Sequence, residues 1–333
     1  MSTTPVVRAE HLRKSYGTTL AVRDVSLTVE RGEIYGVLGR NGAGKTTTVE
    51  MIAGLRRPDG GTVEVLGLDP TTQAAALHER VGLQLQESAM PDRLRVREAL
   101  DLYASFYPDP ADPVDLLDLL GLTAKQDTAF KDLSGGQKQR LSVALALVGR
   151  PELAILDELT TGLDPHARRE TWAVVEAIRD AGVTIILVTH LMEEAERLCD
   201  RIALIASGRV AAVGTPAEIV TLAQGAQVLR VRPQTPVADA VLLAAVAGVP
   251  DVRDAAVEDR ALVVRGGGTV VQDVMVALAR HDVRAQDVRL ERASLEDAFV
   301  SLTGDTAGSD TTGSDTARPT TPAATPTTAP AEV

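Results

Sequence analysis

The nine residues from Gly39 to Thr47, GRNGAGKTT, constrain this chain more than any other segment. They fit the pattern G-x-x-x-x-G-K-[ST], whose backbone amides close around phosphates between a strand and a helix. An apolar run at 34–38 precedes them, and a helical pattern follows at 47–55. The lysine of such a loop reaches the β- and γ-phosphates, and the hydroxyl after it is placed to ligate Mg²⁺. The segment therefore predicts a bound nucleoside triphosphate, held by Gly39, Asn41, Gly42, Gly44, Lys45, Thr46 and Thr47.

The overall composition excludes several other kinds of protein. At 333 residues the chain has room for two domains. Its formal net charge of −12 disfavours a nucleic-acid surface, because neutralising phosphates requires clustered Lys and Arg. Cys199 is the only cysteine, so we expect no intramolecular disulfide and a reducing cytoplasm. No apolar run approaches the ~18 residues of a membrane span, so any spanning part is expected from another chain.

Apolar runs that alternate with helical patterns predict an α/β domain over residues 1–222. The runs at 153–156 and 184–188 are apolar throughout, which is typical of parallel strands that are buried on both faces. A helical pattern lies between them at 165–181. Residues 77–120 are predicted to be mostly helical and to form a helical subdomain, divided by Pro91, Pro108, Pro110 and Pro113.

The pattern changes beyond residue 226 to the order β-α-β-β-α-β. This order predicts a small ferredoxin-like α+β domain over residues 226–303, with an accessory or dimerisation role. Its expected strands and helices are, in order, 227–232, 237–247, 253–257, 261–265, 269–279 and 284–290. Residues 304–333 are rich in Thr, Pro and Ala and nearly lack large apolar side chains, so we expect a disordered tail there.

Two acids, Asp157 and Glu158, follow the expected strand at 153–156. Ligands in open α/β sheets gather at the carboxyl ends of the strands, so both carboxyls are expected beside the phosphates. Asp157 is then placed to join the Mg²⁺ shell with Thr46, and Glu158 to polarise the water that attacks the γ-phosphate. The alternative is a pair of solvated acids at a strand end.

The segment LSGGQKQR at residues 133–140 precedes a helical pattern. Ser134 is a good N-cap, and Gly135 and Gly136 leave backbone N–H groups uncovered, which suits an anion. Alone, the segment also fits a capped helix start. It resembles the signature of ATP-binding-cassette (ABC) ATPases, and it lies before the acidic strand end as in that family. The resemblance implies a P-loop NTPase fold, ATP and Mg²⁺ as cofactors, and a homodimer in which one subunit closes on the ATP of the other through Ser134, Gly135, Gly136 and Gln137.

The same resemblance implies roles for four further residues. His190, at the end of an apolar run, matches the switch histidine that contacts the γ-phosphate. Gln86 resembles the glutamine that touches Mg²⁺ and water and reports to the membrane partner, with Gln84 as a competitor for that role. Asp164 resembles the residue whose loop crosses the dimer interface. Tyr16 resembles the aromatic that stacks on adenine.

Some of these residues also fit simpler interpretations. From the residues alone, His190 is a structural histidine at a strand end, and Tyr16 is a core aromatic at a strand edge. Two leucines, Leu159 and Leu85, stand where proline is frequent in the family, after the second acid and before the glutamine. Neither removes a functional group, so hydrolysis is expected to survive.

The segment at 293–304 is similar to the closing segment of daunorubicin-resistance-type drug-export ATPases. This resemblance implies a place at the cytoplasmic face of the cell membrane, on a separate polytopic permease that handles a small-molecule cargo. As a helix, the segment places Leu295, Phe299 and Leu302 on one face. The sequence leaves open whether that face packs on its own domain or makes a dimer or regulatory contact.

The sequence thus predicts the ATP-binding and ATP-hydrolysing subunit of an exporter for a drug-like compound. The alternatives are an exporter of lipid or polysaccharide, a soluble ABC ATPase of the translation or repair type, and a module that binds a drug without moving it. One phosphate loop, one signature and no long heptad insert argue against the soluble types. The acidic charge argues in the same direction, so no nucleic-acid partner is expected.

Overall fold

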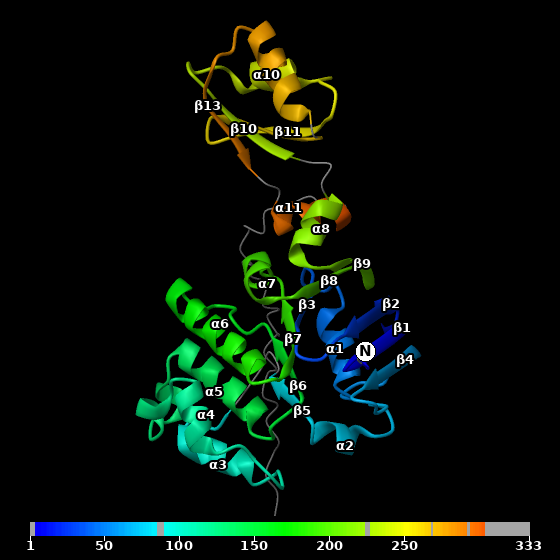
Figure 1. Cartoon of the computed structure of the whole chain (residues 1–333), viewed down its shortest axis with the longest axis vertical. Coiled ribbons are helices and arrows are strands. Elements are labelled where there is room, and N and C mark those ends of the chain that lie inside the picture. Colours follow the sequence, from blue (N-terminus) through cyan, green and yellow to red (C-terminus); the bar gives the residue numbers. More distant parts are fainter. Residues whose placement is uncertain (1–3, 85–89, 224–226, 268, 292–293, 304–333) are drawn as a thin grey trace, which may run out of the picture.

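The computed structural model describes residues 4–84, 90–223, 227–267, 269–291 and 294–303. Their strands form two sheets, one of nine strands and one of four, in separate parts of the molecule (Figure 1). The nine-stranded sheet has the order β4-β1-β2-β9-β8-β3-β7-β6-β5. Its strands are β1 Val7–Tyr16, β2 Thr19–Val29, β3 Ile34–Leu38, β4 Gly60–Val65, β5 Val81–Gln84, β6 Leu153–Asp157, β7 Thr184–Thr189, β8 Arg201–Ala206 and β9 Arg209–Gly214.

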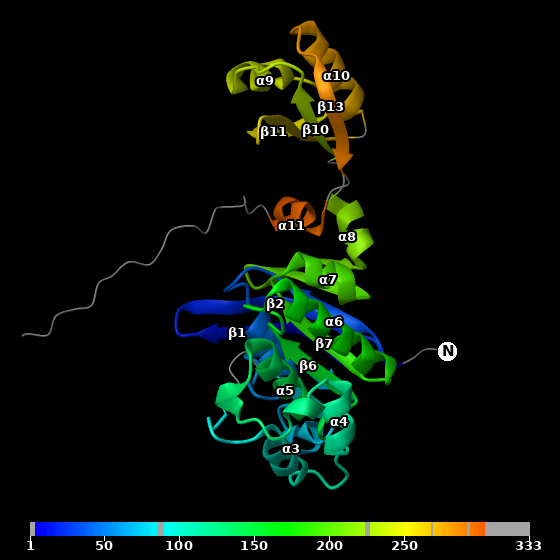
Figure 2. The same cartoon turned by 90° about the vertical axis from the view of Figure 1, so that its left-hand side faces the viewer.

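The helices of this part cover both faces of the sheet (Figures 1 and 2). They are α1 Lys45–Ile52, α2 Ala74–His78, α3 Val96–Ala104, α4 Pro113–Leu119, α5 Gly135–Leu147, α6 Pro165–Asp180, α7 Met192–Leu198 and α8 Pro216–Ala223, with short 3₁₀ turns at Thr123–Lys125 and Phe130–Asp132. Among the described residues, no helix combines the length and the apolar character needed to cross a membrane.

The central strands are buried on both faces, as their continuous apolar runs predict. Strands β5, β6, β7, β3 and β8 pair in parallel, and every residue of β3, β6 and β7 is buried. Alternate residues serve two cores: Ile34 and Leu38 pack with α5, α6 and α7, whereas Tyr35 and Val37 pack with α1. The predicted α/β fold is confirmed, and its central strands are parallel as expected. The whole sheet is mixed, because β1 pairs antiparallel with β2 and β4, and β8 pairs antiparallel with β9.

The segment 81–84 differs from its sequence-based prediction. It was expected to belong to a mostly helical stretch, but it forms β5, which pairs in parallel with β6 at the edge of the sheet. Gly82 permits this position, because a Cβ there would lie 2.0 Å from the carbonyl oxygen of Ala146. A run of four residues between helical patterns is too short to show a period of its own.

The four-stranded sheet has the order β11-β12-β10-β13 and is antiparallel throughout. Its elements in chain order are β10 Gln227–Pro233, α9 Asp239–Val246, β11 Val252–Glu258, β12 Ala261–Gly266, α10 Val270–Arg280 and β13 Ala285–Glu291. Leu229, Val231, Leu262 and Val264 form its core with side chains from α9 and α10. This order and pairing are those of a ferredoxin-like α+β fold, as predicted.

The last described helix, α11 (Leu295–Thr303), packs mainly on the larger part of the chain, and Asp297 also pairs with Arg265 of β12 at 3.6 Å. It lies beside α8 and close to α7 (Figure 2). Leu295 and Phe299 join the core beneath α5, α6 and α7, and Leu302 packs against it. The backbone N–H of Leu295 donates a hydrogen bond to Glu196 of α7 at 2.8 Å. The apolar face predicted for this segment is therefore the buried one, but it faces the larger part of the chain.

Candidate nucleotide site

The phosphate loop leads from β3 into α1, as the sequence predicts. Lys45 opens the helix and is only 5% exposed, and its Nζ donates to the carbonyl oxygens of Gly39 at 2.8 Å and Arg40 at 3.2 Å. Gly44 has a φ of 101°, and a Cβ there would lie 2.5 Å from the carbonyl oxygen of Ala21. The loop thus needs a glycine at this position, and its lysine is held back against the loop's own carbonyls.

The end of β6 brings a buried acid to the start of α1. Thr46 Oγ1 donates to Asp157 Oδ2 at 3.3 Å, and Asp157 is 1% exposed. The other carboxyl oxygen, Oδ1, is buried without a hydrogen-bond partner in the described part of the chain. A hydroxyl beside a carboxylate with an unused oxygen fits Mg²⁺, which takes one or two carboxylates plus phosphate oxygens. No cluster of three or more His, Cys, Asp or Glu side chains suited to a metal is found among the described residues.

Burial and neighbouring charges shift the pKa values of two groups in this site. Burial and then the neighbouring Glu158 carboxylate raise the pKa of Asp157 from 3.8 to about 6. Burial also lowers the pKa of Lys45, although Glu158 and Asp157 oppose that shift. A cation bound beside Asp157 and Glu158 would therefore offset the repulsion between their two carboxylates.

We expect Asp157→Asn to stabilise the magnesium-free and nucleotide-free protein at pH 8. The folded protein holds the Asp157 proton more tightly than the unfolded chain does, so ionisation between about pH 4 and about pH 6 costs native stability. Asparagine removes that cost, by about 2–3 kcal/mol at pH 8 and by almost nothing at pH 4.

Urea unfolding in EDTA at the two pH values measures this difference. Asp109→Asn is the control, because the Asp109 side chain is 86% exposed. A gain for Asp157→Asn that is equal at pH 4 and pH 8 would contradict the shifted pKa.

Glu158 and His190 meet at the carboxyl ends of neighbouring strands. The Nδ1 atom of His190 lies 3.3 Å from Glu158 Oε1. Glu158 follows β6 with a φ of 49°, a left-handed conformation that is uncommon for a side chain other than Gly, Asn or Asp. Its backbone N–H donates to Val188 of β7 at 2.9 Å, which holds this turn in place. Strained backbone of this kind clusters at functional sites.

Of the two glutamines predicted as candidates for the metal contact, only Gln84 lies among the described residues. Gln86 lies outside the described residues. Gln84 is 3% exposed, and its Oε1 accepts a hydrogen bond from the backbone N–H of Asp157 at 3.1 Å. Sequence reasoning missed this bond between β5 and β6, because a glutamine in a four-residue strand gives no signal of its partner.

The predicted signature residues begin α5. Ser134 Oγ accepts from the N–H of Gln137 at 3.3 Å, and Gln137 Oε1 accepts from the N–H of Ser134 at 3.0 Å. This capping box confirms the expected N-cap. Ser134 and Gly135 are exposed, and a Cβ on Gly136 would lie 3.2 Å from the Cβ of Ala167. The start of α5 therefore lies against α6 and presents its first residues to solvent.

Asp164 caps α6, where it accepts from the N–H groups of His166 at 2.9 Å and Ala167 at 3.0 Å. These bonds lower its pKa. Tyr16, at the end of β1, is 41% exposed, and the Arg56 guanidinium lies 5.4 Å from its ring centre. Tyr16 is thus a surface aromatic and does not belong to the core, contrary to the simpler interpretation.

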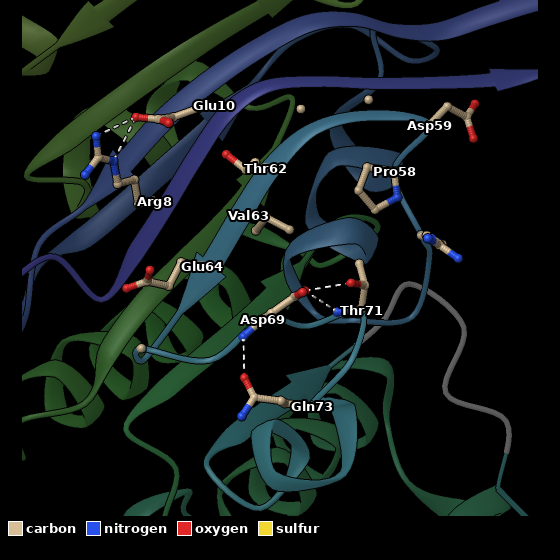
Figure 3. Close-up of a pocket in the computed structure, with 14 residues that line it drawn as sticks. Arg8, Glu10, Pro58, Asp59, Thr62, Val63, Glu64, Asp69, Thr71 and Gln73 are labelled. Carbon is tan, nitrogen blue, oxygen red and sulfur yellow. Dashed lines mark hydrogen bonds and ion pairs between the residues drawn. The ribbon is translucent and has the colours of Figure 1, made fainter.

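Two cavities lie in the nine-stranded part of the chain. One, of about 280 Å³, is lined by loop residues 40–43, by residues 205–207 at the end of β8 and by Phe299 of α11. The other, of about 730 Å³, lies along β4, where Arg8 pairs with Glu10 and Asp69 bonds Thr71 (Figure 3). The second is lined by none of the predicted site residues, so it does not mark the nucleotide site.

A phosphate loop, two acids and a histidine at the carboxyl edge of parallel strands define a P-loop nucleoside triphosphatase. The model of the family described as ABC transporter matches residues 22–161, and relatives of about 40% identity extend the match. The chain belongs to the ABC transporter family, and it is an ATP-binding, ATP-hydrolysing subunit of a transporter.

Two of the relatives are each about 40% identical to this chain. The Nod factor export ATP-binding protein I of Ralstonia nicotianae is 39% identical over 236 residues, which cover 69% of this chain and 74% of the relative. The daunorubicin/doxorubicin resistance ATP-binding protein DrrA of Streptomyces peucetius is 40% identical over 239 residues, covering 70% and 72%.

Solved structures match the nine-stranded part. The ATP-binding subunit of an ABC transporter aligns with a TM-score of 0.59 and 28% identity, over 65% of this chain and 92% of its own. An ATP-binding cassette in a dimeric, post-hydrolysis state with ADP and Pi aligns with a TM-score of 0.58 and 23% identity, over 63% and 98%. At that identity the second likeness shows the fold alone.

Proposed function

We propose that this chain is the ATP-hydrolysing subunit of an exporter and works on a separate polytopic membrane permease at the cytoplasmic face of the membrane. The observation that carries the proposal is the convergence of Lys45, Asp157, Glu158 and His190 on one edge of the sheet. The names of the export and drug-resistance relatives support export as the direction of transport.

Each of these residues has its own role in the proposed hydrolysis of ATP. Lys45 leaves the loop carbonyls and neutralises the β- and γ-phosphates, while the loop glycines and Thr47 expose backbone N–H groups to them. Thr46 and Asp157, with Gln86, hold Mg²⁺, which supplies charge stabilisation at the phosphates when bound. Glu158 orients and polarises the attacking water, and His190, 3.3 Å away, contacts the γ-phosphate.

A second copy completes each site in this proposal. Ser134, Gly135, Gly136 and Gln137 contact the ATP held by the other subunit, and the segment around Asp164 crosses the interface. Ser134, Gly135 and Asp164 are exposed at the starts of α5 and α6, which supports this arrangement. Tyr16 offers adenine a flat surface face. We assign this nucleotide-binding work to residues 1–222 and an accessory or dimerisation role to residues 226–303.

An apolar surface patch at the C-terminal end of α3 and just beyond it supports docking to the permease. Leu102, Tyr103 and Phe106 are 48%, 36% and 68% exposed, and the two aromatic rings meet edge to face at 5.9 Å. Exposed apolar side chains that gather in this way mark interaction sites. We propose that a cytoplasmic helix of the permease covers this patch.

The proposed cargo is a drug-like compound, and a lipid or polysaccharide is the alternative. Cells that carry the chain and its permease should lose preloaded doxorubicin several-fold faster with the parental chain than with Lys45→Ala. Faster loss of a labelled lipid or glycolipid alone would favour the alternative.

Two other outcomes of this efflux experiment would overturn the assignment of the chain to an exporter. Equal loss of every probe, with ATP hydrolysis intact, would indicate a soluble ATPase. Saturable doxorubicin binding by the purified chain, with no difference in efflux, would indicate a module that sequesters the drug.

A further inference from the structure

A buried carboxyl outside the nucleotide site links α7, α6 and the turn that leads from Glu158 to Asp164. Glu194 lies on α7 and is 0% exposed. Its Oε1 accepts two hydrogen bonds, from Thr160 Oγ1 at 2.8 Å and from Trp172 Nε1 at 3.2 Å. Its other oxygen, Oε2, is buried without a hydrogen-bond partner in the part of the chain that the structure describes.

Each of these contacts reaches a different part of the site. Glu194 is on the helix that begins two residues after His190. Thr160 is two residues after Glu158, in the turn that leads to Asp164, and it is fully buried. Trp172 is on α6, the helix that Asp164 caps, and α6 packs against α7 (Figures 1 and 2). One carboxyl oxygen therefore fixes α7, the turn and α6 relative to one another.

Packing alone does not account for an acid at this place. A leucine of similar volume would fill the space without the desolvation cost of a carboxyl. A hydrogen bond, unlike apolar contact, fixes direction as well as distance. The two bonds to Oε1 hold α7 in one register against the turn, and so set where His190 stands relative to Glu158.

We propose that Glu194 is a positioning residue for ATP hydrolysis: it holds the His190 end of α7 against the turn from Glu158 to Asp164. The inference rests on the roles proposed above for those residues. Because the phosphate loop is attached to a different strand, ATP binding does not depend on this link. Loss of the link lowers the rate of the chemical step and leaves the affinity for ATP in place.

The test compares kcat and KM for ATP in the full chain. Glu194→Leu and, from the other end, Thr160→Val should each lower kcat by about tenfold while KM stays within about twofold, since a small misplacement of reacting groups is costly. Glu194→Gln keeps an oxygen for both donors and should retain kcat within about threefold. The double variant Thr160→Val/Glu194→Leu should be no slower than the slower single variant, because both single changes remove the same Thr160–Glu194 hydrogen bond.

Thr184→Val is the matched control. Thr184 is also fully buried, and its Oγ1 accepts one hydrogen bond, from the N–H of Gly32 at 3.0 Å. It should lose stability but keep the parental kcat. An equal fall of kcat in this control, or no recovery in Glu194→Gln, would reduce Glu194 to a structural role and overturn the inference.

Glu158→Gln separates this inference from the proposed function. If Glu158→Gln stops hydrolysis but folded Thr160→Val and Glu194→Leu both turn over at the parental rate, only the positioning role fails. If Glu158→Gln itself hydrolyses ATP normally, the roles proposed for the site fail first. Should Glu194→Leu not fold, Thr160→Val, which removes a single hydroxyl, still decides the question.

Discussion

Replacing Glu158 with glutamine is expected to slow ATP hydrolysis by about 10²- to 10³-fold and to leave ATP binding intact. Glutamine has the size of glutamate, but it cannot take a proton from the attacking water. The phosphate loop and Asp157 are unchanged, so ATP and Mg²⁺ still bind. The variant should then accumulate as a dimer closed on uncleaved ATP, which size-exclusion chromatography with light scattering detects.

Glu193→Gln is the control for this change. Glu193 is on the neighbouring helix α7, its side chain is 71% exposed, and it pairs with Arg168 at the surface. Its replacement should leave hydrolysis and oligomeric state at their parental values. A parental rate of hydrolysis in Glu158→Gln would show that another group activates the water.

Replacing Lys45 with alanine is expected to weaken ATP binding by about 10²-fold or more and to abolish measurable hydrolysis, since a charged group that contacts phosphate contributes several kcal/mol. The ammonium group is buried, and Asp157 and Glu158 are the nearest opposing charges acting on it. Without it, the repulsion between those carboxylates and the triphosphate is offset by less positive charge.

Isothermal titration of ATP with Mg²⁺ measures this loss. Lys125→Ala, a change of an exposed lysine in a 3₁₀ turn, should bind ATP as the parent does. ATP affinity that is equal in Lys45→Ala and in the parent would place the phosphates elsewhere on the molecule.

The sequence predicted the features that a local pattern encodes. The strand Ile34–Leu38 and the ferredoxin-like order were expected from continuous apolar runs and from their spacing. The phosphate loop follows from a short motif whose glycines are required by the backbone itself. Such features depend on neighbouring residues, which a single sequence displays directly.

The sequence did not predict features that depend on contacts between distant segments. The strand β5 is too short to show a period, and it is defined by pairing with β6, about 70 residues later. The helix α11 was assigned with the small domain, but its N–H bond to Glu196 spans 99 residues. The partners of Glu194 come from the turn before α6 and from α6 itself, and no spacing rule connects them.

The most direct test of the transporter assignment is a pull-down of the tagged full-length chain from detergent-solubilised native membranes, with mass spectrometry of its partners. Phe106→Ser is the matched variant, because Phe106 is 68% exposed and belongs to the proposed docking patch. We expect a stoichiometric membrane protein with several spans to co-purify with the parent and much less with Phe106→Ser, while ATP hydrolysis is equal in both. Recovery of ribosomes, DNA or nothing by an active parental chain would contradict the account.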